Sequence, residues 1–215
     1  MATACGPRLA TTCEPANLVT GDGDSVNPEN AVQPEDLMAG FRATSDGVTA
    51  RFAKPEAAII RDLVAQVVEL VVADMPAPDP DELAAMVGLS ESSEVPDDPV
   101  LARLLPDGYR DDPEAAQEFR RFTESGLRSA KVESAQMLLQ TLPASGGRVR
   151  LSSDQAEAWL RSLNDVRLAL GVRLGVTEDF DGLSEDMVAD DPRYAYIQVY
   201  QWLAFLQESL VAALS

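Results

Sequence analysis

Two cysteines are the residues of this chain with the clearest capacity for redox chemistry. Cys5 and Cys13 are its only cysteines among 215 residues, with seven residues between them. A flexible linker of that length brings two sulfur atoms together without strain, so a disulfide between them is geometrically permitted. In a reducing compartment, exposed thiols usually form reversible pairs rather than structural crosslinks. Cys5 and Cys13 are therefore a candidate redox pair, and the alternative is two incidental residues of a terminal tail.

The reactivity of this pair depends on its thiolate content, because the thiolate is the nucleophile. Arg8 lies between the two cysteines and is the first basic residue of the chain. Its positive charge favours the thiolate, whereas the formal net charge of −19 disfavours it. These opposed effects leave both interpretations of Cys5 and Cys13 open.

Pairs of adjacent aspartates also suggest chemistry, because Mg²⁺ and Ca²⁺ prefer clustered oxygen ligands. The pairs are Asp97-Asp98, Asp111-Asp112 and Asp190-Asp191, and a proline follows each of them. An aspartate before a proline is typical of a helix start, where the carboxylate accepts hydrogen bonds from free N–H groups. The chain contains no D-x-D-x-D-G calcium loop. We therefore predict that these aspartates cap helices rather than bind a metal.

Other catalytic patterns are weak. The segment Ser145-Gly146-Gly147-Arg148 lacks the Lys-Ser/Thr of a phosphate-binding loop and follows a helical pattern, so a turn from a helix into a strand is the better interpretation. No spacing distinguishes a carboxylate pair for glycoside chemistry. We predict no catalytic residues, no cofactor, no metal and no enzymatic activity. A small metal-assisted hydrolase built on carboxylates is the alternative.

Charge and composition exclude several functions. The chain has 36 Asp and Glu, 17 Lys and Arg, and no histidine. Without histidine there is no Ser-His-Asp or Cys-His pair and no histidine-ligated metal. The negative charge disfavours direct contact with nucleic acid or anionic membranes, and favours a partner protein with a basic surface. Because the chain has neither a signal-peptide start nor a continuous apolar span, we predict a cytoplasmic protein.

The composition divides the chain into two parts. Residues 1–38 contain four prolines and no aromatic residue, so they are predicted to be a disordered, cysteine-containing tail. Residues 39–215 are predicted to form a single helical domain. Asp46-Gly47 lies between two alternating segments, which predicts a β-hairpin at about 40–52.

Periodic apolar residues and Asp-Pro dipeptides predict the helices. Lys54-Pro55-Glu56 opens a helix that is apolar through Val72, and Asp79-Pro80, Asp98-Pro99, Asp112-Pro113 and Asp191-Pro192 mark four more helix starts. In the long helix from about 113 to 142, we expect the core face to contain Phe119, Phe122, Leu127, Ala130, Met137 and Leu138.

The C-terminal third continues this pattern. Residues 148–151 alternate as a short strand that could join the hairpin, and a helix from about 154 to 174 follows. Residues 175–191 form an acidic loop, and the last helix, from about 192 to 213, is apolar on nearly all sides, which predicts central burial or a homodimer. The predicted fold is mainly α (α+β): a multi-helix bundle with a small antiparallel sheet.

Five segments in this order resemble an actinobacterial domain family of long-unknown function, one branch of which is the oxidative-stress regulator AosR. The resemblance covers about residues 41–215. The segments are 55–72 (PEAAIIRDLVAQVVELVV), 98–109 (DPVLARLLPDGY), 138–151 (LLQTLPASGGRVRL), 158–171 (AWLRSLNDVRLALG) and 200–211 (YQWLAFLQESLV).

This resemblance implies a redox-responsive regulator of transcription that senses oxidants through an N-terminal cysteine pair. It further implies contact with a sigma factor or RNA polymerase, which agrees with the acidic charge. Cys5 and Cys13 would be that pair. The alternative from a different class is a non-redox adaptor or scaffold, with a possible link to proteolysis, that holds a partner or a second copy through the last helix or the acidic loop.

Overall fold

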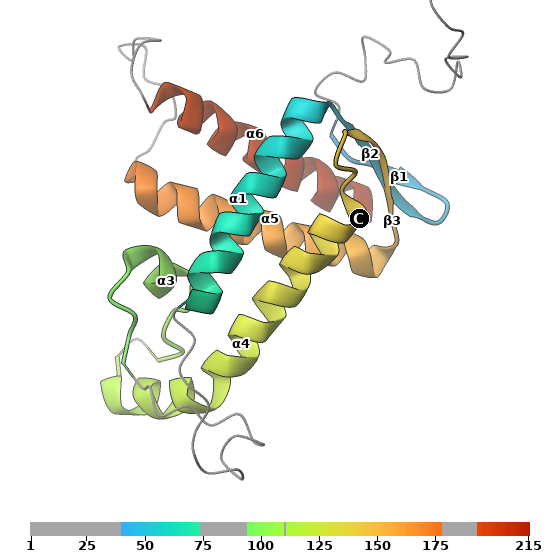
Figure 1. Cartoon of the computed structure of the whole chain (residues 1–215). Coiled ribbons are helices and arrows are strands. Elements are labelled where there is room, and N and C mark those ends of the chain that lie inside the picture. Colours follow the sequence, from blue (N-terminus) through green and yellow to red (C-terminus); the bar gives the residue numbers. More distant parts are fainter. Residues whose placement is uncertain (1–39, 74–93, 110, 178–192) are drawn as a thin grey trace, which may run out of the picture. The chain divides into compact units, whose positions relative to one another are not determined.

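The computed structural model describes residues 40–73, 94–109, 111–177 and 193–215 (Figure 1). The predictions for the tail, for the helix after Asp79-Pro80 and for most of the acidic loop fall outside these residues. All the described residues belong to the unit Gln33–Ser215. They are mainly helical, with five helices and one small sheet among them, so the predicted fold class is confirmed.

The sheet contains three short antiparallel strands in the order β1-β2-β3. Strand β1 spans Arg42–Thr44, β2 spans Gly47–Phe52 and β3 spans Gly147–Leu151. Every second residue of β2 is buried, as expected for a sheet with one face on the core. The hairpin and its pairing with 148–151 are therefore confirmed. Its turn residues are Ser45-Asp46 rather than Asp46-Gly47, because Gly47 already pairs with Thr44.

Helix α1 spans Lys54–Ala73 and α3 spans Pro99–Leu104. The α1 start is stabilised by Glu56, whose Oε2 accepts a hydrogen bond from the Ala53 N–H. The predicted apolar stripe of α1 is only partly buried: Ile60, Val64, Val67 and Val71 lie in the core, whereas Ile59 and Val72 are exposed. The buried stripe follows i, i+4 and i+7 spacing, which is one helix face and not the wider band that the sequence suggested.

Helix α4 spans Pro113–Thr141 and α5 spans Ser153–Leu174. Ser152 and Gln155 form a reciprocal capping box at the start of α5. Between the two helices, Gly146 turns the chain into β3 with a φ of 74°. A Cβ at Gly146 would lie 2.7 Å from the Lys54 nitrogen, so only glycine fits this turn. The predicted helix-to-strand turn is thereby confirmed.

Helix α6 spans Tyr194–Leu214. Its N-cap residue is Arg193, which makes no side-chain cap hydrogen bond. The Asp191-Pro192 dipeptide, which was predicted to cap this helix, lies outside the described residues. The apolar surface of α6 divides into a buried and an exposed part. The buried apolar residues are Ile197, Leu203, Leu206 and Leu210, and the exposed ones are Tyr196, Phe205, Val211 and Leu214.

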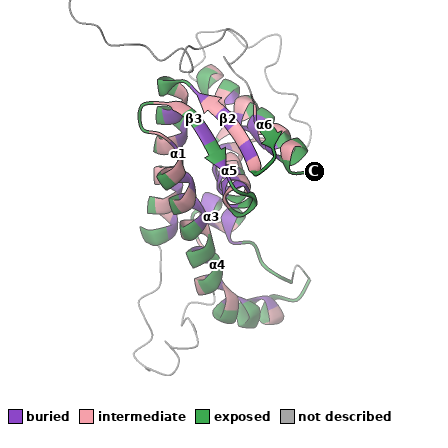
Figure 2. Ribbon diagram, turned by 90° about the vertical axis from the view of Figure 1, so that its right-hand side faces the viewer, coloured by how far each residue is buried: buried purple, intermediate pink, exposed green. Residues whose placement is uncertain are grey.

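Helix α5 is the centre of the packing, since it contacts the other four described helices and strands β2 and β3. Its Trp159 is fully buried and stacks on Phe52, with ring centroids 5.7 Å apart, while Phe41 meets both rings edge to face. Figure 2 shows the buried faces of the helices and the sheet turned toward this centre. The predicted core residues of α5 are confirmed, namely Trp159, Leu163, Val166 and Leu170.

Arginines from neighbouring helices satisfy the free carbonyl groups at helix ends. The last carbonyls of a helix have no partner within it. Arg61 of α1 donates from Nη2 to the Leu142 carbonyl at the end of α4, at 2.8 Å. Arg128 of α4 in turn donates from Nη1 to the Val71 carbonyl at the end of α1, also at 2.8 Å. These reciprocal bonds fasten the C-terminal end of each helix to the other helix.

Candidate functional site

The sequence-predicted redox pair, Cys5 and Cys13, lies outside the described residues. Two of the predicted caps are confirmed. Asp98 accepts hydrogen bonds from the Val100 and Leu101 N–H groups, and Asp112 accepts one from Ala115. Among the described residues, no group of three or more His, Cys, Asp or Glu side chains could hold a metal ion.

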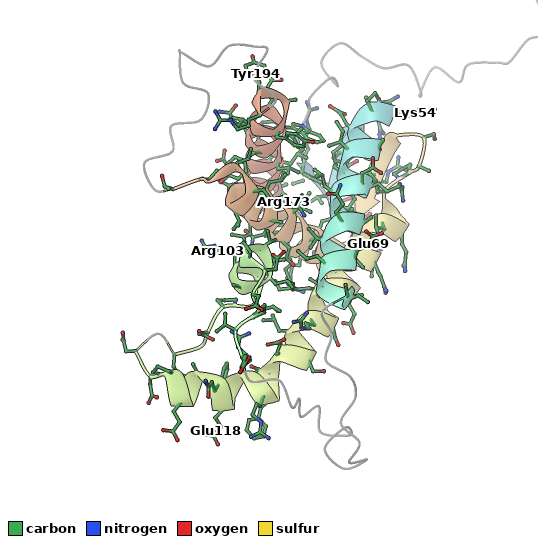
Figure 3. The ribbon with its side chains drawn as sticks, turned by 60° about the vertical axis from the view of Figure 1, so that its left-hand side comes forward. Lys54, Glu69, Arg103, Glu118, Arg173 and Tyr194 are labelled. Carbon is green, nitrogen blue, oxygen red and sulfur yellow. The ribbon has the colours of Figure 1, made fainter. Side chains whose placement is uncertain are left out.

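The first part of α4 projects from the other helices. Figures 1 and 3 show that α4 bends, and that the segment carrying Glu118 runs at a steep angle to the remainder. Two local features account for a bend: Thr123 donates from Oγ1 to the Phe119 carbonyl at 2.8 Å, and Ser125-Gly126 follows. We name residues 113–123 the α4 arm. It is mostly exposed, as Figure 2 shows.

The predicted core face of α4 is wrong over much of the helix. Phe119, Phe122 and Leu127 are exposed, with 45%, 58% and 40% of their surface accessible, and Ala130 is exposed as well. Of the predicted set, Leu138 is buried and Met137 partly buried. Tyr109, which precedes the helix, is also exposed and meets the Phe119 ring edge to face at 5.7 Å. We name Tyr109, Phe119 and Phe122 the aromatic patch.

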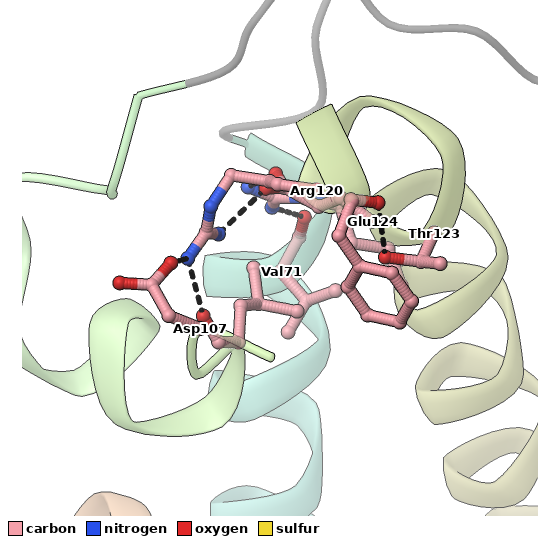
Figure 4. A network of polar contacts seen from close by, with 8 residues as sticks. Val71, Asp107, Arg120, Thr123 and Glu124 are labelled. Atoms are coloured by element: carbon pink, nitrogen blue, oxygen red, sulfur yellow. Dashed lines mark hydrogen bonds and ion pairs between the residues drawn. The ribbon is translucent and has the colours of Figure 1, made fainter. Parts of the chain in front are cut away.

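The buried face of α4 contains charged residues instead. Arg120, Glu124 and Arg128 have 5%, 5% and 1% of their surface accessible. Figure 4 shows the polar contacts of Arg120 with Asp107 and Glu124. Glu124 accepts from both arginines: its Oε2 lies 2.8 Å from Arg120 Nη1, and its Oε1 lies 2.7 Å from Arg128 Nη2. Arg120 also donates from Nη2 to the Leu105 carbonyl at 3.0 Å and pairs with Asp107 at 2.7 Å.

These contacts make the network a clasp. Arg120 holds the end of α3, Arg128 holds the end of α1 through Val71, and Glu124 joins the two arginines. Burial alone would lower the pKa of Arg120, but hydrogen bonds and attraction from Asp107 and Glu124 outweigh it, so the pKa is raised. Arg120 therefore stays charged, and the clasp fixes the base of the α4 arm.

Several carboxylates lie close in the chain to the aromatic patch, together with the exposed Arg121. Asp107, Asp111, Asp112, Glu114 and Glu118 are nearby in the chain, and Asp111, Asp112, Glu114 and Glu118 are exposed. Figure 3 shows Glu118 pointing away from the rest of the molecule. Exposed aromatic residues with a charged rim are typical of protein-interaction surfaces. The arrangement suits a partner with an apolar pocket and charged groups beside it.

The sequence contained a signal for the clasp that apolar periodicity did not detect. Arg120, Glu124 and Arg128 follow one another at intervals of four, which places all three on one helix face. Such a pattern usually indicates a solvated face. Here the long apolar stems of the arginines and the carbonyl groups of α1 and α3 allow burial.

A groove of about 620 Å³ lies where α3, α5 and α6 meet. Its lining includes Arg103, Asn164, Arg167 and Tyr200. The Arg167 guanidinium lies over the Tyr200 ring, 5.0 Å from the centroid, and its Nη1 is 3.4 Å from Gln207 Oε1. The two arginines give this groove a positive lining in an otherwise acidic chain.

A second buried ion pair joins α4 to α5. Lys131 Nζ lies 2.7 Å from Asp165 Oδ1, and the two side chains have 14% and 8% of their surface accessible. Burial raises the pKa of Asp165 above its ordinary value, although the hydrogen bond and charge of Lys131 act in the opposite direction. The effect of burial on the pKa of this carboxylate thus outweighs the opposite effect of Lys131.

This shift predicts a pH dependence that Asp165→Asn removes. The folded protein binds the Asp165 proton more tightly than the unfolded chain, so this site contributes less stability as the pH rises from the ordinary pKa through the raised one. We expect the stability of the wild type minus that of the variant to fall as the pH rises above the ordinary pKa of an aspartate, about 4. Urea unfolding of both proteins at several pH values measures this difference. The contributions of the other carboxylates to the pH dependence are the same in both proteins and cancel in the difference. A difference that is flat or rises with pH would contradict the assignment.

No described helix is long and apolar enough to span a membrane.

The chain is 38% identical over 188 residues to proteins named "Oxidative stress regulator AosR" from Mycobacterium bovis and Mycobacterium tuberculosis H37Rv. Each alignment covers 80% of this chain and 84% of the relative. No solved structure matches it.

A family match gives the broadest comparison. Residues 38–214 match the family described as "Domain of unknown function (DUF2017)". The matched range includes all the described helices and strands. Cys5 and Cys13 precede the matched region. Because the match extends over most of its length, the chain belongs to the DUF2017 family.

Proposed function

We propose that this protein is a redox-responsive regulator of the oxidative-stress response, located in the cytoplasm. The observation that carries the proposal is the 38% identity, over 80% of the chain, to relatives named oxidative stress regulator. The regulator acts without catalysis, through contact with a sigma factor or RNA polymerase. The proposal contains two separate steps, partner contact and oxidant sensing.

Partner contact is supported by charge and by the α4 arm. A net charge of −19 opposes direct binding to DNA, so an effect on transcription has to pass through another protein. The aromatic patch offers exposed rings on a segment whose base the clasp holds in place. The negative charge of the whole chain would attract a basic partner and accelerate encounter. We assign the contact with the transcription machinery to this arm.

Oxidant sensing is assigned to Cys5 and Cys13. One thiolate attacks a peroxide oxygen, the O–O bond breaks, and sulfenic acid forms with release of water or hydroxide. The second thiolate then attacks the sulfenic sulfur, forming the disulfide and releasing a second oxygen as hydroxide or water. Two thiols are oxidised while one hydrogen peroxide is reduced to two water molecules. A cellular thiol reverses the reaction by exchange.

The predicted result is that peroxide changes partner binding only when both cysteines are present. Full-length protein is treated with mild hydrogen peroxide, and its intact mass and mobility on a non-reducing gel are measured. We expect the loss of two hydrogen masses within one chain, reversed by dithiothreitol. Pull-down of RNA polymerase holoenzyme should then differ between reduced and oxidised wild type, but not for Cys5→Ser or Cys13→Ser.

Two further variants test the surface. Phe122→Ala removes an exposed ring of the aromatic patch and should weaken recovery of RNA polymerase in either redox state. Val72→Ala truncates an exposed apolar side chain on α1 and is the matched control. Absence of the disulfide would refute sensing by this pair. Recovery of proteolytic components alone from an actinobacterial lysate, insensitive to oxidant, would favour the non-redox adaptor.

A further inference from the structure

The groove between α3, α5 and α6 differs in charge from the chain as a whole. Its volume of about 620 Å³ lies within the range of small-molecule sites. Arg103 of α3 and Arg167 of α5 belong to the described lining, in which there is no Asp or Glu. The chain as a whole has 36 Asp and Glu against 17 Lys and Arg. The groove therefore has the local charge that an anionic ligand requires.

Neither arginine is neutralised by a described carboxylate. The ion pairs in the described part of the chain use other basic residues. Asp107 follows Arg103 by four positions, but it pairs with Arg120 at 2.7 Å. The residues three and four positions from Arg167 carry no charge, namely Leu163, Asn164, Leu170 and Gly171. Because a guanidinium does not lose its proton in proteins, both side chains keep a full positive charge.

Arg167 is held in place while part of its hydrogen-bonding capacity is unused. Its guanidinium lies over the Tyr200 ring, 5.0 Å from the centroid, and Nη1 has one long contact of 3.4 Å with Gln207 Oε1. Its Nε is buried and has no described hydrogen-bond partner. A side chain that is already ordered loses little conformational freedom when a ligand binds. Arg103 is exposed and has no described polar partner, so its long side chain can turn toward a ligand.

We propose that this groove binds the phosphate group of a small molecule between Arg103 and Arg167. A phosphate monoester carries a charge of about −2 at neutral pH and has three acceptor oxygens, which suits two planar guanidinium groups better than a single carboxylate does. The Asn164 amide and the Thr177 hydroxyl are further donors in the lining. The body of the ligand would contact the apolar side chains of the lining, Leu168, Val172 and Val176.

The net charge of −19 limits the affinity of this site without removing it. At physiological ionic strength, exposed charges more than about 8 Å away are largely screened, whereas a guanidinium in contact with the ligand is not. A DNA backbone extends over a long surface and would meet many carboxylates, but a single phosphate group meets only the lining of the groove. The site uses neither Cys5 and Cys13 nor the aromatic patch, so it can be tested separately from the regulator function.

Calorimetric titration of the full-length, reduced protein with phenyl phosphate, at constant ionic strength, tests the proposal. We expect one saturable site per chain. Arg103→Gln and Arg167→Gln should each raise the Kd about tenfold or more, because each removes a charge-assisted hydrogen bond. Arg150→Gln makes the same change of charge at an exposed residue of β3, outside the groove, and should leave the Kd unchanged.

Two comparisons make the test decisive. Benzoate has the same ring with a single negative charge, and it should bind more weakly than phenyl phosphate. Circular dichroism checks that each variant is folded, and Arg103→Gln alone decides the outcome if Arg167→Gln does not fold, since Arg103 has no described polar contact to lose. The absence of saturable binding, an equal effect of Arg150→Gln, or benzoate binding as tightly as phenyl phosphate would overturn the proposal.

Discussion

Glu124→Leu should lower the free energy of unfolding by about 3–5 kcal/mol, because it leaves two buried arginines without their shared carboxylate. Glu124 accepts from Arg120 and Arg128 at 2.8 Å and 2.7 Å, and all three side chains are nearly inaccessible to water. Arg120 retains Asp107 and the Leu105 carbonyl, whereas Arg128 retains the Val71 carbonyl. Urea unfolding followed by circular dichroism measures the loss.

The matched control is Glu157→Leu on α5. Glu157 also pairs with an arginine four residues away, Arg161 at 2.6 Å, but both side chains are more than half exposed. Exposed pairs contribute about 0–1 kcal/mol, so this variant should unfold almost like the wild type. A similar small loss for Glu124→Leu and Glu157→Leu would show that the clasp does not hold the α4 arm.

Trp159→Ala should cost about 3–5 kcal/mol, the usual range for deleting a large buried ring. Trp159 has no accessible surface, and its ring contacts Phe41 and Phe52. Its Nε1 also donates to Thr141 Oγ1 at 2.7 Å, which joins α5 to the end of α4. Truncation therefore removes packing between the sheet and α5 and one hydrogen bond between helices. Thermal and urea unfolding report the effect.

A conservative variant separates the contributions of ring packing and hydrogen bonding at Trp159, and a variant at an exposed ring is the control. Trp159→Phe keeps most of the ring packing but loses the Nε1–H donor, and should cost about 1–2 kcal/mol, as for a lost buried hydrogen bond. Phe122→Ala truncates an exposed ring and should cost less than about 0.5 kcal/mol, as for ordinary surface changes. A loss for Trp159→Ala no larger than that for Phe122→Ala would contradict the central role of Trp159.

Local signals predicted most of the secondary structure because they act over a few residues. Asp98 and Asp112 cap the helices that their Asp-Pro dipeptides mark, and α5 begins at Ser153, close to the predicted start at about 154. The hairpin and the strand 148–151 were likewise evident from alternation and turn residues. Each of these features depends on hydrogen bonds or backbone preferences between neighbours in the chain.

The candidate site was less predictable, because it depends on which face of a helix meets other helices. Apolar spacing along α4 pointed to Phe119 and Phe122 as core residues, yet both are exposed and Arg120 is buried. Burial of Arg120 is possible only because the carbonyl of Leu105 and the side chains of Asp107 and Glu124 surround it. Glu124 lies on the same helix as Arg120. Leu105 and Asp107 lie outside that helix, so helix periodicity could not show that they would surround Arg120.

By itself, then, the amino-acid sequence determined the starts of α1, α3, α4 and α5, the three strands, the acidic charge and the family resemblance, since these follow from local order and composition. Only the tertiary structure decided that charged residues occupy the inner face of α4, that aromatic rings lie on its outer face, and that Phe41 binds Ser209 of α6. Those outcomes depend on partners supplied by distant segments, because a charged side chain is buried only where other elements supply an opposite charge and most of its hydrogen bonds.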